Sequence, residues 1–237
     1  MRTVQGDIDE GLSRLFSKPV STVGAGRTDA GVHALAQVMS TQDAPDDCEP
    51  AKVLASLNKM CGPAIAVHDC RVVPQDFHAR FSARSRTYVY AIFTGAVHDP
   101  WLSATALYHP GRLDVGAMNE ASGHLVGEHD FRSFGRAPDA DASPMRILYE
   151  LSCRADGDLV RIRARANAFL QQMVRSLVGT LMQVGDGRRS PDDIVEILGA
   201  GDRAAAGPVA PPHGLCLVAV EYDSGWSWPR MVRSFGG

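Results

Sequence analysis

One alternating segment constrains the fold of this chain more than any other feature. From Leu159 to Ala166, apolar residues alternate with Arg161, Arg163 and Arg165, so the two kinds of side chain belong on opposite faces of a β-strand. The preceding segment, Ile147–Arg154, predicts a second strand, joined to the first by a short turn that contains Asp-Gly. The sequence therefore predicts an antiparallel hairpin with one basic face.

Amphipathic helices are interspersed with strands of this kind. Phe169–Val184 has the strongest helical periodicity, and Val4–Phe16 has a similar stripe. Asp114 is placed to cap a third helix. Further helices are predicted at 52–58 and 191–199, and further strands at 19–23, 32–40, 65–73, 86–94 and 214–222. Because hairpins predominate over regular βαβ units, the α+β class is favoured, with an N-terminal lobe at 1–80 and a C-terminal lobe at 81–237.

Composition excludes several classes of protein. The chain has 237 residues, of which 45% are hydrophobic and 22% charged, as in ordinary globular proteins. Its longest apolar runs, such as Leu215–Val220, are far shorter than the about 20 residues of a membrane span. The acidic residues among the first ten do not fit a signal peptide. Five scattered cysteines without a C-x-x-C pair favour a reducing, cytoplasmic setting over disulfides or structural zinc.

The charges are segregated although the net charge is only −3. Almost all basic residues are arginine, with Lys+Arg totalling 24, and the segments 77–98 and 159–185 contain several arginines and no acidic residue. Arginine suits planar, bidentate contact with phosphate, so these segments indicate a nucleic-acid-binding face. A codon bias towards arginine, with solvated strand faces, is the alternative interpretation.

A glycine-rich loop at Gly24–Gly31 presents Arg27 and Asp29 between two predicted strands. It lacks the third glycine of a dinucleotide-binding fingerprint and the lysine of a phosphate-binding P-loop. A guanidinium near the Asp29 carboxylate would keep it ionised, as a nucleophile or base requires. The alternative is a turn aspartate that accepts hydrogen bonds from the local backbone.

Other candidate groups are less specific. The eight histidines lack the spacing of a metal site, and no metal ligands are predicted. Tyr88 and Tyr90 share one face of a predicted strand and suit a core or an interface. If Tyr88 faces a cleft beside the arginines, its ring could stack on a nucleobase.

Five blocks of the sequence together resemble the tRNA pseudouridine synthase A family. The Gly26–Ala34 block, followed by Gln37 and Val38, is similar to the family's signature loop. The other similar blocks are Asp76–Ala83 with Arg86–Tyr90, Gly127–Phe131 with Ser133–Phe134, Asn167–Leu170 with Met173–Arg175 and Val178–Gly179, and Ala210–Pro211 with Gly214–Leu215 and Val220–Tyr222. The order of the blocks matches, and they span nearly the whole chain.

The resemblance implies a fold and a function. The fold would be two ferredoxin-like lobes that share a mixed, mostly antiparallel sheet, with a central basic cleft. The protein would be a cytoplasmic homodimer that needs no cofactor or metal and has no membrane association. It would isomerise uridine to pseudouridine at positions 38, 39 and 40 of the tRNA anticodon stem-loop.

The resemblance also assigns roles to individual residues. Asp29 would be the nucleophile, with Arg27 beside it and Arg175 as its charge partner, and Tyr88 would stack on the base. The remaining substrate-binding candidates are Arg80, Arg161, Arg163 and Arg165.

Two departures from the family pattern affect these expectations. Ala36 stands where the family usually has glycine. The chain begins with residues that resemble an internal family segment, so the family's first strand is expected to be absent. A late assigned start, a fragment and an altered protein are the open explanations. The alternative function is therefore a catalytically impaired tRNA-binding protein.

Overall fold

The chain divides into two compact units in a computed structural model that describes residues 2–137 and 142–223. The first unit comprises the residues up to Arg27 together with Val38–Ala83, and the second comprises Thr28–Gln37 together with the residues from Arg84 onwards. The segment that carries Asp29 thus groups with the second unit. The two predicted lobes, 1–80 and 81–237, and their ferredoxin-like folds stay predictions.

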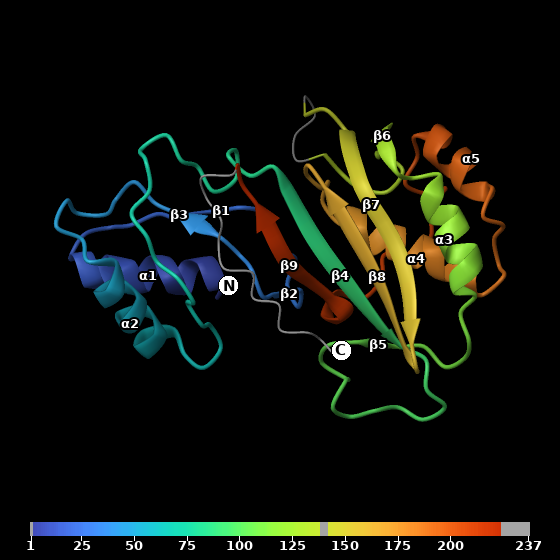
Figure 1. The fold of residues 1–237 in the computed structure, drawn as a ribbon, viewed down its shortest axis with the longest axis horizontal. Coiled ribbons are helices and arrows are strands. Elements are labelled where there is room, and N and C mark those ends of the chain that lie inside the picture. Colours follow the sequence, from blue (N-terminus) through green and yellow to red (C-terminus); the bar gives the residue numbers. More distant parts are fainter. Residues whose placement is uncertain (1, 138–141, 224–237) are drawn as a thin grey trace. The chain divides into compact units, whose positions relative to one another are not determined.

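Two packed helices form the centre of the first unit (Figure 1). Between them in the sequence are two short strands that pair as an antiparallel ribbon. The helices are α1 (Val4–Phe16), as predicted, and α2 (Pro50–Cys61), and the strands are β1 (Val23–Gly24) and β3 (Met39–Ser40). Their apolar stripes bury a small core. Its buried residues are Leu12, Val20, Val53, Leu57 and Cys61.

The strand predicted at 19–23 is almost entirely replaced by loop. Side chains take the backbone donors that a strand would offer to a neighbour. The amides of Val20, Ser21 and Thr22 donate to a serine hydroxyl and to the carboxylates of Asp9 and Asp43. These side-chain bonds compete with strand pairing, so only Val23 and Gly24 pair with another strand.

The strand predicted at 65–73 is wrong for a similar reason. The segment is not part of a sheet. Val67, the third residue of this segment, is held by the side chain of Asn58 in α2, which accepts from the Val67 amide at 2.7 Å and donates to its carbonyl at 2.8 Å. A single amide side chain thus replaces a neighbouring strand.

The second unit contains a mixed, mostly antiparallel, open sheet, which confirms the α+β class (Figure 1). The strands lie in the order β2-β9-β4-β8-β7-β6, with β5 paired to β4. The β2–β9 and β4–β5 pairs are parallel, and the others are antiparallel. The strands are β2 (His33–Ala34), β4 (Ser85–Phe93), β5 (Leu107–Tyr108), β6 (Gly127–Asp130), β7 (Met145–Asp156), β8 (Leu159–Ala166) and β9 (Leu215–Glu221).

The predicted strand at 32–40 is interrupted, because its two ends pair with different partners. His33 and Ala34 pair with β9, whereas Met39 and Ser40 pair with β1. The chain leaves one compact unit and enters the other between these two pairs, after Gln37. No periodicity in the sequence marks such a change of partner.

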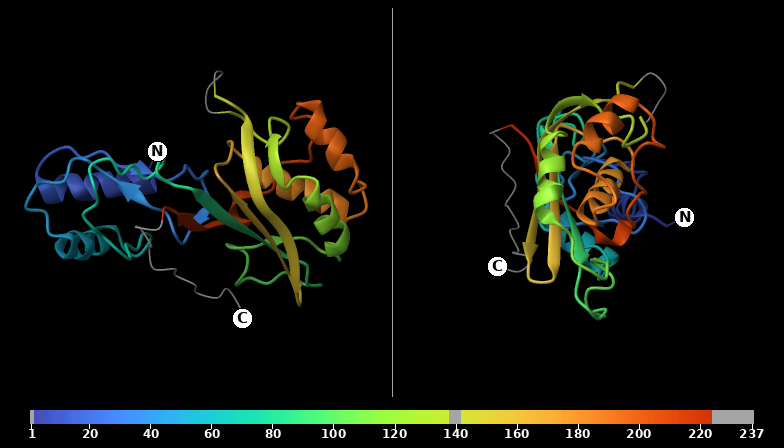
Figure 2. Two further views of the ribbon diagram at one scale, coloured as in Figure 1. Left: turned by 45° about the horizontal axis from the view of Figure 1, so that its top comes forward. Right: turned by 90° about the vertical axis from the view of Figure 1, so that its right-hand side faces the viewer.

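The predicted hairpin is confirmed, and one face of its sheet carries the helices. In Figure 2, right, α4 (Met173–Gly185) and α5 (Asp193–Ala200) lie on one side of the strands. Helix α3 (Val115–Gly123) packs on the same face, because its Ser122 contacts Cys153 of β7, which is paired with Ile162 of β8. Ile162, Ala164 and Ala166 on β8 are fully buried. The three arginines of β8 alternate with them and therefore occupy the opposite face.

The helices of the second unit differ from prediction at their ends. Asp114 caps α3 as expected, accepting from the Ala117 amide. Helix α4 begins four residues later than predicted, because Gln171 pairs with Arg136 and Gln172 has a positive φ of 62°. Helix α5 continues to Ala200 rather than stopping at Gly199, and Gly201, with φ +62°, is its C-cap.

Two further features concern cysteine and membranes. Each of the five cysteines, all within the described residues, is a free thiol. Among residues 2–137 and 142–223, no helix has both the length and the apolar composition to cross a membrane.

Candidate active site

Asp29 opens a tight turn at one edge of the sheet in the second unit. The Val32 amide donates to the Asp29 carbonyl at 3.0 Å, and Gly31 has a φ of +84°. A positive φ at the third position of a turn defines type II and favours glycine there. Strand β2 follows at once and pairs with β9, which anchors the turn to the sheet.

Arg175 holds the Asp29 side chain. It lies in the first turn of α4, and its guanidinium donates to Asp29 Oδ2 at 2.7 Å. A second nitrogen, Nε, donates to the Ala210 carbonyl at 2.7 Å, and the Ala210 amide donates to the Arg175 carbonyl at 3.0 Å. The Arg175 side chain is 12% exposed and that of Asp29 is 29% exposed. The guanidinium is therefore fixed at two points while the carboxylate stays open to solvent.

The segment that carries Ala210 is seated closely on α4. The Gly207 amide donates to the Thr180 hydroxyl at 2.9 Å. A side chain at Gly179 would overlap the Pro208 carbonyl oxygen, so only glycine allows this approach. The small residues of α4 thus determine where the Ala210 carbonyl meets Arg175.

Tyr90 supports the same segment from the sheet. Its ring is fully buried, and its hydroxyl donates to the Pro211 carbonyl at 2.8 Å. The short 3-10 helix η1 (Pro212–Gly214) follows, and a Cβ built on Gly31 would lie 3.1 Å from Pro212 Cγ. Tyr90 and Pro212 therefore fix the loop against which both Arg175 and the Asp29 turn rest. The sequence had indicated a core or interface role for Tyr90, which agrees with this burial.

Tyr88 lies close enough to Asp29 for the two to interact electrostatically. The pKa of Tyr88 is raised to about 12, mainly by burial and to a smaller extent by the Asp29 carboxylate, while Arg86 opposes the shift. The ring is 7% exposed and meets Phe169 edge to face, with centroids 5.3 Å apart. At neutral pH the hydroxyl is therefore protonated. Phe169 was in a matching sequence block, but its contact with Tyr88 had no signal in the sequence.

The structure thus brings Asp29 and Arg175 into contact, with Tyr88 within electrostatic range of Asp29, and places the three arginines of β8 on another face of the sheet. Arg161, Arg163 and Arg165 share a face with residues 87, 89 and 91 of β4, which is the face opposite to Tyr88. Each forms an ion pair there, with Asp156, Glu150 and Glu221 respectively, and Arg165 also lies over the Tyr149 ring.

Arg27 and Arg80 belong to the first unit, and both are exposed. Arg80 lies over the ring of Phe81, with its Cζ 5.6 Å from the ring centroid. The roles predicted for Arg27 and Arg80 stay predictions.

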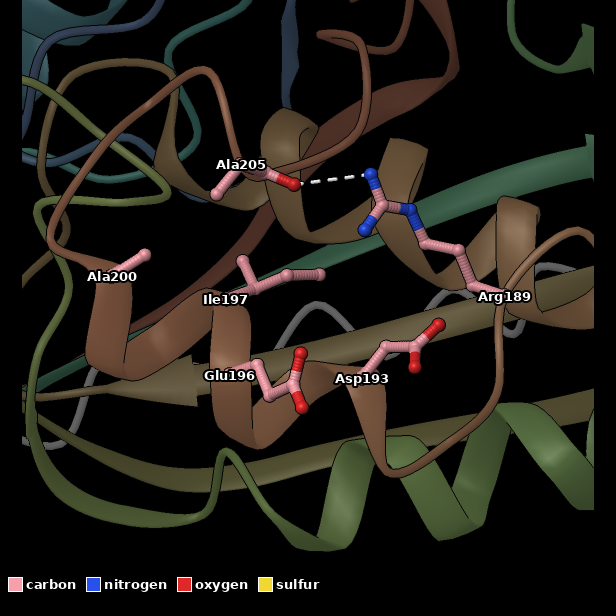
Figure 3. A pocket seen from close by; sticks show the side chains of 6 residues that line it. All are labelled: Arg189, Asp193, Glu196, Ile197, Ala200 and Ala205. Atoms are coloured by element: carbon pink, nitrogen blue, oxygen red, sulfur yellow. Dashed lines mark hydrogen bonds between the residues drawn. The ribbon is translucent and has the colours of Figure 1, made fainter.

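A separate cavity of about 510 Å³ opens beside α5 (Figure 3). Six residues line it: Arg189, Asp193, Glu196, Ile197, Ala200 and Ala205. Arg189 donates to the Ala205 carbonyl, as Figure 3 shows, and to Gln183. Arg175 and Arg189 are separated by most of the length of α4, so this cavity is distinct from the Asp29 site.

The described residues contain no group of three or more histidine, cysteine, aspartate or glutamate side chains that could hold a metal ion. The chemistry available from the described side chains at the Asp29 turn is therefore that of a carboxylate, a guanidinium and a neutral phenol. A carboxylate fixed in this way can attack an electrophilic carbon or accept a proton.

Comparison with known proteins identifies the class first. A family model described as "tRNA pseudouridine synthase" matches residues 121–223, which include β7, β8, β9 and the Arg175-bearing helix α4. This part of the sheet and the Arg175 segment are therefore similar to those of tRNA pseudouridine synthases.

The particular family follows from full-length relatives. The tRNA pseudouridine synthase A of Methylibium petroleiphilum is 42% identical over 236 residues, covering 98% of this chain and 89% of the relative. Those of Paraburkholderia xenovorans and Burkholderia mallei are each 40% identical, covering 96% of this chain and 84% of each relative. This chain belongs to the tRNA pseudouridine synthase A family.

Proposed function

We propose that this protein converts uridine to pseudouridine in tRNA, with Asp29 as the nucleophile. The observation that carries the proposal is the 2.7 Å ion pair of Asp29 with Arg175, with the neutral phenol of Tyr88 within electrostatic range of the carboxylate. Family membership supports an isomerase acting on tRNA. The site supplies the one activated carboxylate that such a reaction needs.

The reaction rearranges bonds within a single nucleotide. The bond from uracil N1 to ribose C1′ breaks, the uracil rotates, and C5 bonds to C1′. The hydrogen on C5 leaves as a proton, and N1 gains one, so the atoms and electrons balance. The Asp29 carboxylate can assist by attacking either the sugar or the base, and its addition is reversed at the end.

The other residues of the site have positioning or binding roles in this proposal. Arg175 holds the carboxylate in one orientation, and Arg27 is the second cationic neighbour along the chain. Tyr88 contacts the base after the nucleotide has left its stack, which costs a few kcal/mol. An aromatic contact returns about 1–3 kcal/mol of that cost.

We assign the substrate and assembly from the family resemblance. The targets are uridines 38, 39 and 40 of the anticodon stem-loop, and the tRNA is held in a basic cleft formed by two ferredoxin-like lobes. Arg80, Arg161, Arg163 and Arg165 are the proposed contacts to the tRNA. The protein acts as a cytoplasmic homodimer.

The Asp29→Asn variant tests the nucleophile. An amide is nearly the same size as a carboxylate and still accepts from Arg175, but it does not act as a nucleophile. We expect tritium release from unmodified tRNA labelled at C5 of uridine to be abolished, while tRNA binding stays close to that of the wild type.

Asp192→Asn is the matched control, because the Asp192 side chain is 86% exposed and lies at the start of α5. This control should retain full activity. Near wild-type tritium release by Asp29→Asn would exclude Asp29 as the nucleophile. A wild-type protein that binds tRNA without releasing tritium would instead support the impaired tRNA-binding alternative.

A further inference from the structure

A rigid turn at His78–Ser82 in the first unit presents an aromatic ring to solvent. The Ser82 amide donates to the His78 carbonyl at 2.9 Å, and the His78 amide donates to the Ser82 hydroxyl at 3.0 Å. The amides of Arg80 and Phe81 both donate to His78 Nδ1 at 3.2 Å. A further bond, from the Ala79 amide to Ser40 Oγ, ties the turn to strand β3. The backbone that carries Phe81 is therefore ordered before any ligand binds.

The Phe81 ring is itself held in place by two neighbours. The His78 ring lies 4.4 Å from it, centroid to centroid, at an interplanar angle of 33°. The Arg80 guanidinium carbon lies 5.6 Å from the same centroid. Phe81 nevertheless remains 76% exposed. We call His78, Arg80 and Phe81 the aromatic platform.

An exposed ring that is held in a fixed position beside a guanidinium suits a ligand with a flat stacking surface and a negatively charged group. A single exposed apolar residue is ordinary, but it is normally free to move. Here the contacts within the turn already restrict the Phe81 ring, so a ligand that stacks on it does not have to offset that loss of conformational entropy and binds more tightly. A guanidinium beside the ring adds attraction for a phosphate attached to that ligand. Nucleotides combine a stacking surface with a phosphate.

We propose that the aromatic platform is a binding site for an unpaired nucleotide of the tRNA, with Phe81 stacking on its base. The inference rests on the proposed function, because tRNA is the nucleic acid that this family acts on. The Phe81 ring offers no nucleophile and no acid or base group, so it contributes to binding and not to the chemical step. Phe81 was not among the residues singled out from the sequence.

The test compares Phe81→Ala and Phe81→Trp with the wild type, using an unmodified tRNA transcript. Loss of one stacked base should weaken tRNA binding by roughly 5- to 150-fold in Phe81→Ala. Phe81→Trp should restore it, because indole also stacks. KM for tritium release should rise with the dissociation constant, while kcat at saturating tRNA should stay the same.

Salt dependence separates stacking from charge. Between about 50 and 200 mM salt, Phe81→Ala should leave the slope of log K against log salt unchanged, whereas Arg80→Gln should reduce it by about 0.7–0.9 if Arg80 contacts a phosphate. Val72→Ala is the matched control, because Val72 is 74% exposed in the same unit but cannot stack. It should bind tRNA as the wild type does.

The outcomes distinguish this inference from the proposed function. An inactive wild-type protein would overturn the proposed function. An active wild type with equal tRNA affinity in Phe81→Ala would overturn the platform alone. Loss of dimers in Phe81→Ala, measured by light scattering with tRNA affinity unchanged, would instead assign the exposed ring to a protein contact.

Discussion

The guanidinium of Arg175 makes two bonds from different nitrogens, one to Asp29 and one to the Ala210 carbonyl. Only arginine offers donors on several nitrogens in a planar, fixed arrangement, whereas a lysine would have to serve both acceptors from a single ammonium nitrogen. The backbone of residue 210 therefore takes part in orienting the carboxylate. At the residue scale, the site consists of one reactive group and the partners that restrict its rotation.

Tyr88 has a measurable signature in the pH dependence of stability. Its pKa is raised from 10.0 to about 12, so the folded protein retains the phenolic proton where the unfolded chain releases it. The associated stability is present below about pH 10 and is lost as the pH rises towards 12, up to about 3 kcal/mol in total. We expect the free energy of unfolding of Tyr88→Phe to fall less than that of the wild type over this interval.

Denaturant unfolding between about pH 8 and 12 measures this difference. Other buried tyrosines also have raised pKa values, so the wild type and the variant are compared at each pH. Parallel curves for the two proteins would show that Tyr88 ionises as readily in the folded state as in the unfolded state.

At the scale of elements, the Asp29 turn depends on its glycine. Gly31 has a φ of +84°, and a Cβ there would also approach Pro212 Cγ at 3.1 Å. An alanine in this conformation costs about 1–2 kcal/mol, and relief of the contact would shift the turn. Because a displacement of about 1 Å in a catalytic group can reduce a rate by about 100-fold, Gly31→Ala should lower kcat by about tenfold or more.

Gly157→Ala is the matched control for the Gly31 substitution. Gly157 also has a positive φ, of +56°, but its added Cβ would meet nothing within 4 Å. It lies in the β7–β8 turn, so it imposes comparable backbone strain outside the site. Both variants should lose similar stability, and only Gly31→Ala should lose tritium release. Equal kcat values in the two variants would argue against a role for this turn in catalysis.

The elements that were predicted correctly are those whose periodicity or capping residue lies within the element's own stretch of sequence. Val4–Phe16 and the β7–β8 hairpin have clear periodicities, and Asp114 is an evident cap. The strands predicted at 19–23 and 65–73 also have apolar, β-branched character, but Asp9, Asp43 and Asn58 bind their backbones instead. Those side chains are distant in sequence, so local patterns do not reveal the competition.

At the scale of the whole molecule, binding of tRNA depends on how charge is distributed over the surface. The net charge is −3, so any attraction to phosphate must come from local groups of arginines. The three arginines of β8 form such a group, but each is paired with a carboxylate on the face of the sheet opposite to α3, α4 and α5. To contact a phosphate, each would have to exchange its partner.

We predict that replacing Arg161, Arg163 and Arg165 by glutamine reduces the salt dependence of tRNA binding. Each phosphate contact contributes about 0.7–0.9 to the slope of log K against log salt, and the existing ion pairs should lower that contribution. The slope should therefore fall by a fraction of this value per arginine. Titrations of tRNA at several salt concentrations measure it, and an unchanged slope would place the RNA on another face.

The sequence by itself determined the α+β class, the main hairpin and the family. The first two follow from local patterns, and the family follows from the order of the five blocks that resemble it. It also indicated Asp29, Tyr88 and Arg175, since the resemblance names residue types at particular positions. These inferences need no knowledge of how distant segments pack.

The resemblance had implied that Arg175 pairs with Asp29, but only the tertiary structure decided how the two residues meet and what supports them. Asp29 and Arg175 are 146 positions apart, and their contact exists because β2 pairs with β9 while residues 207–210 rest on α4. The alternation of β8 assigned its arginines to one face, but not to the face opposite Tyr88. The register of β4 against β8 made that assignment, because paired strands must place directly opposed side chains on the same side of the sheet.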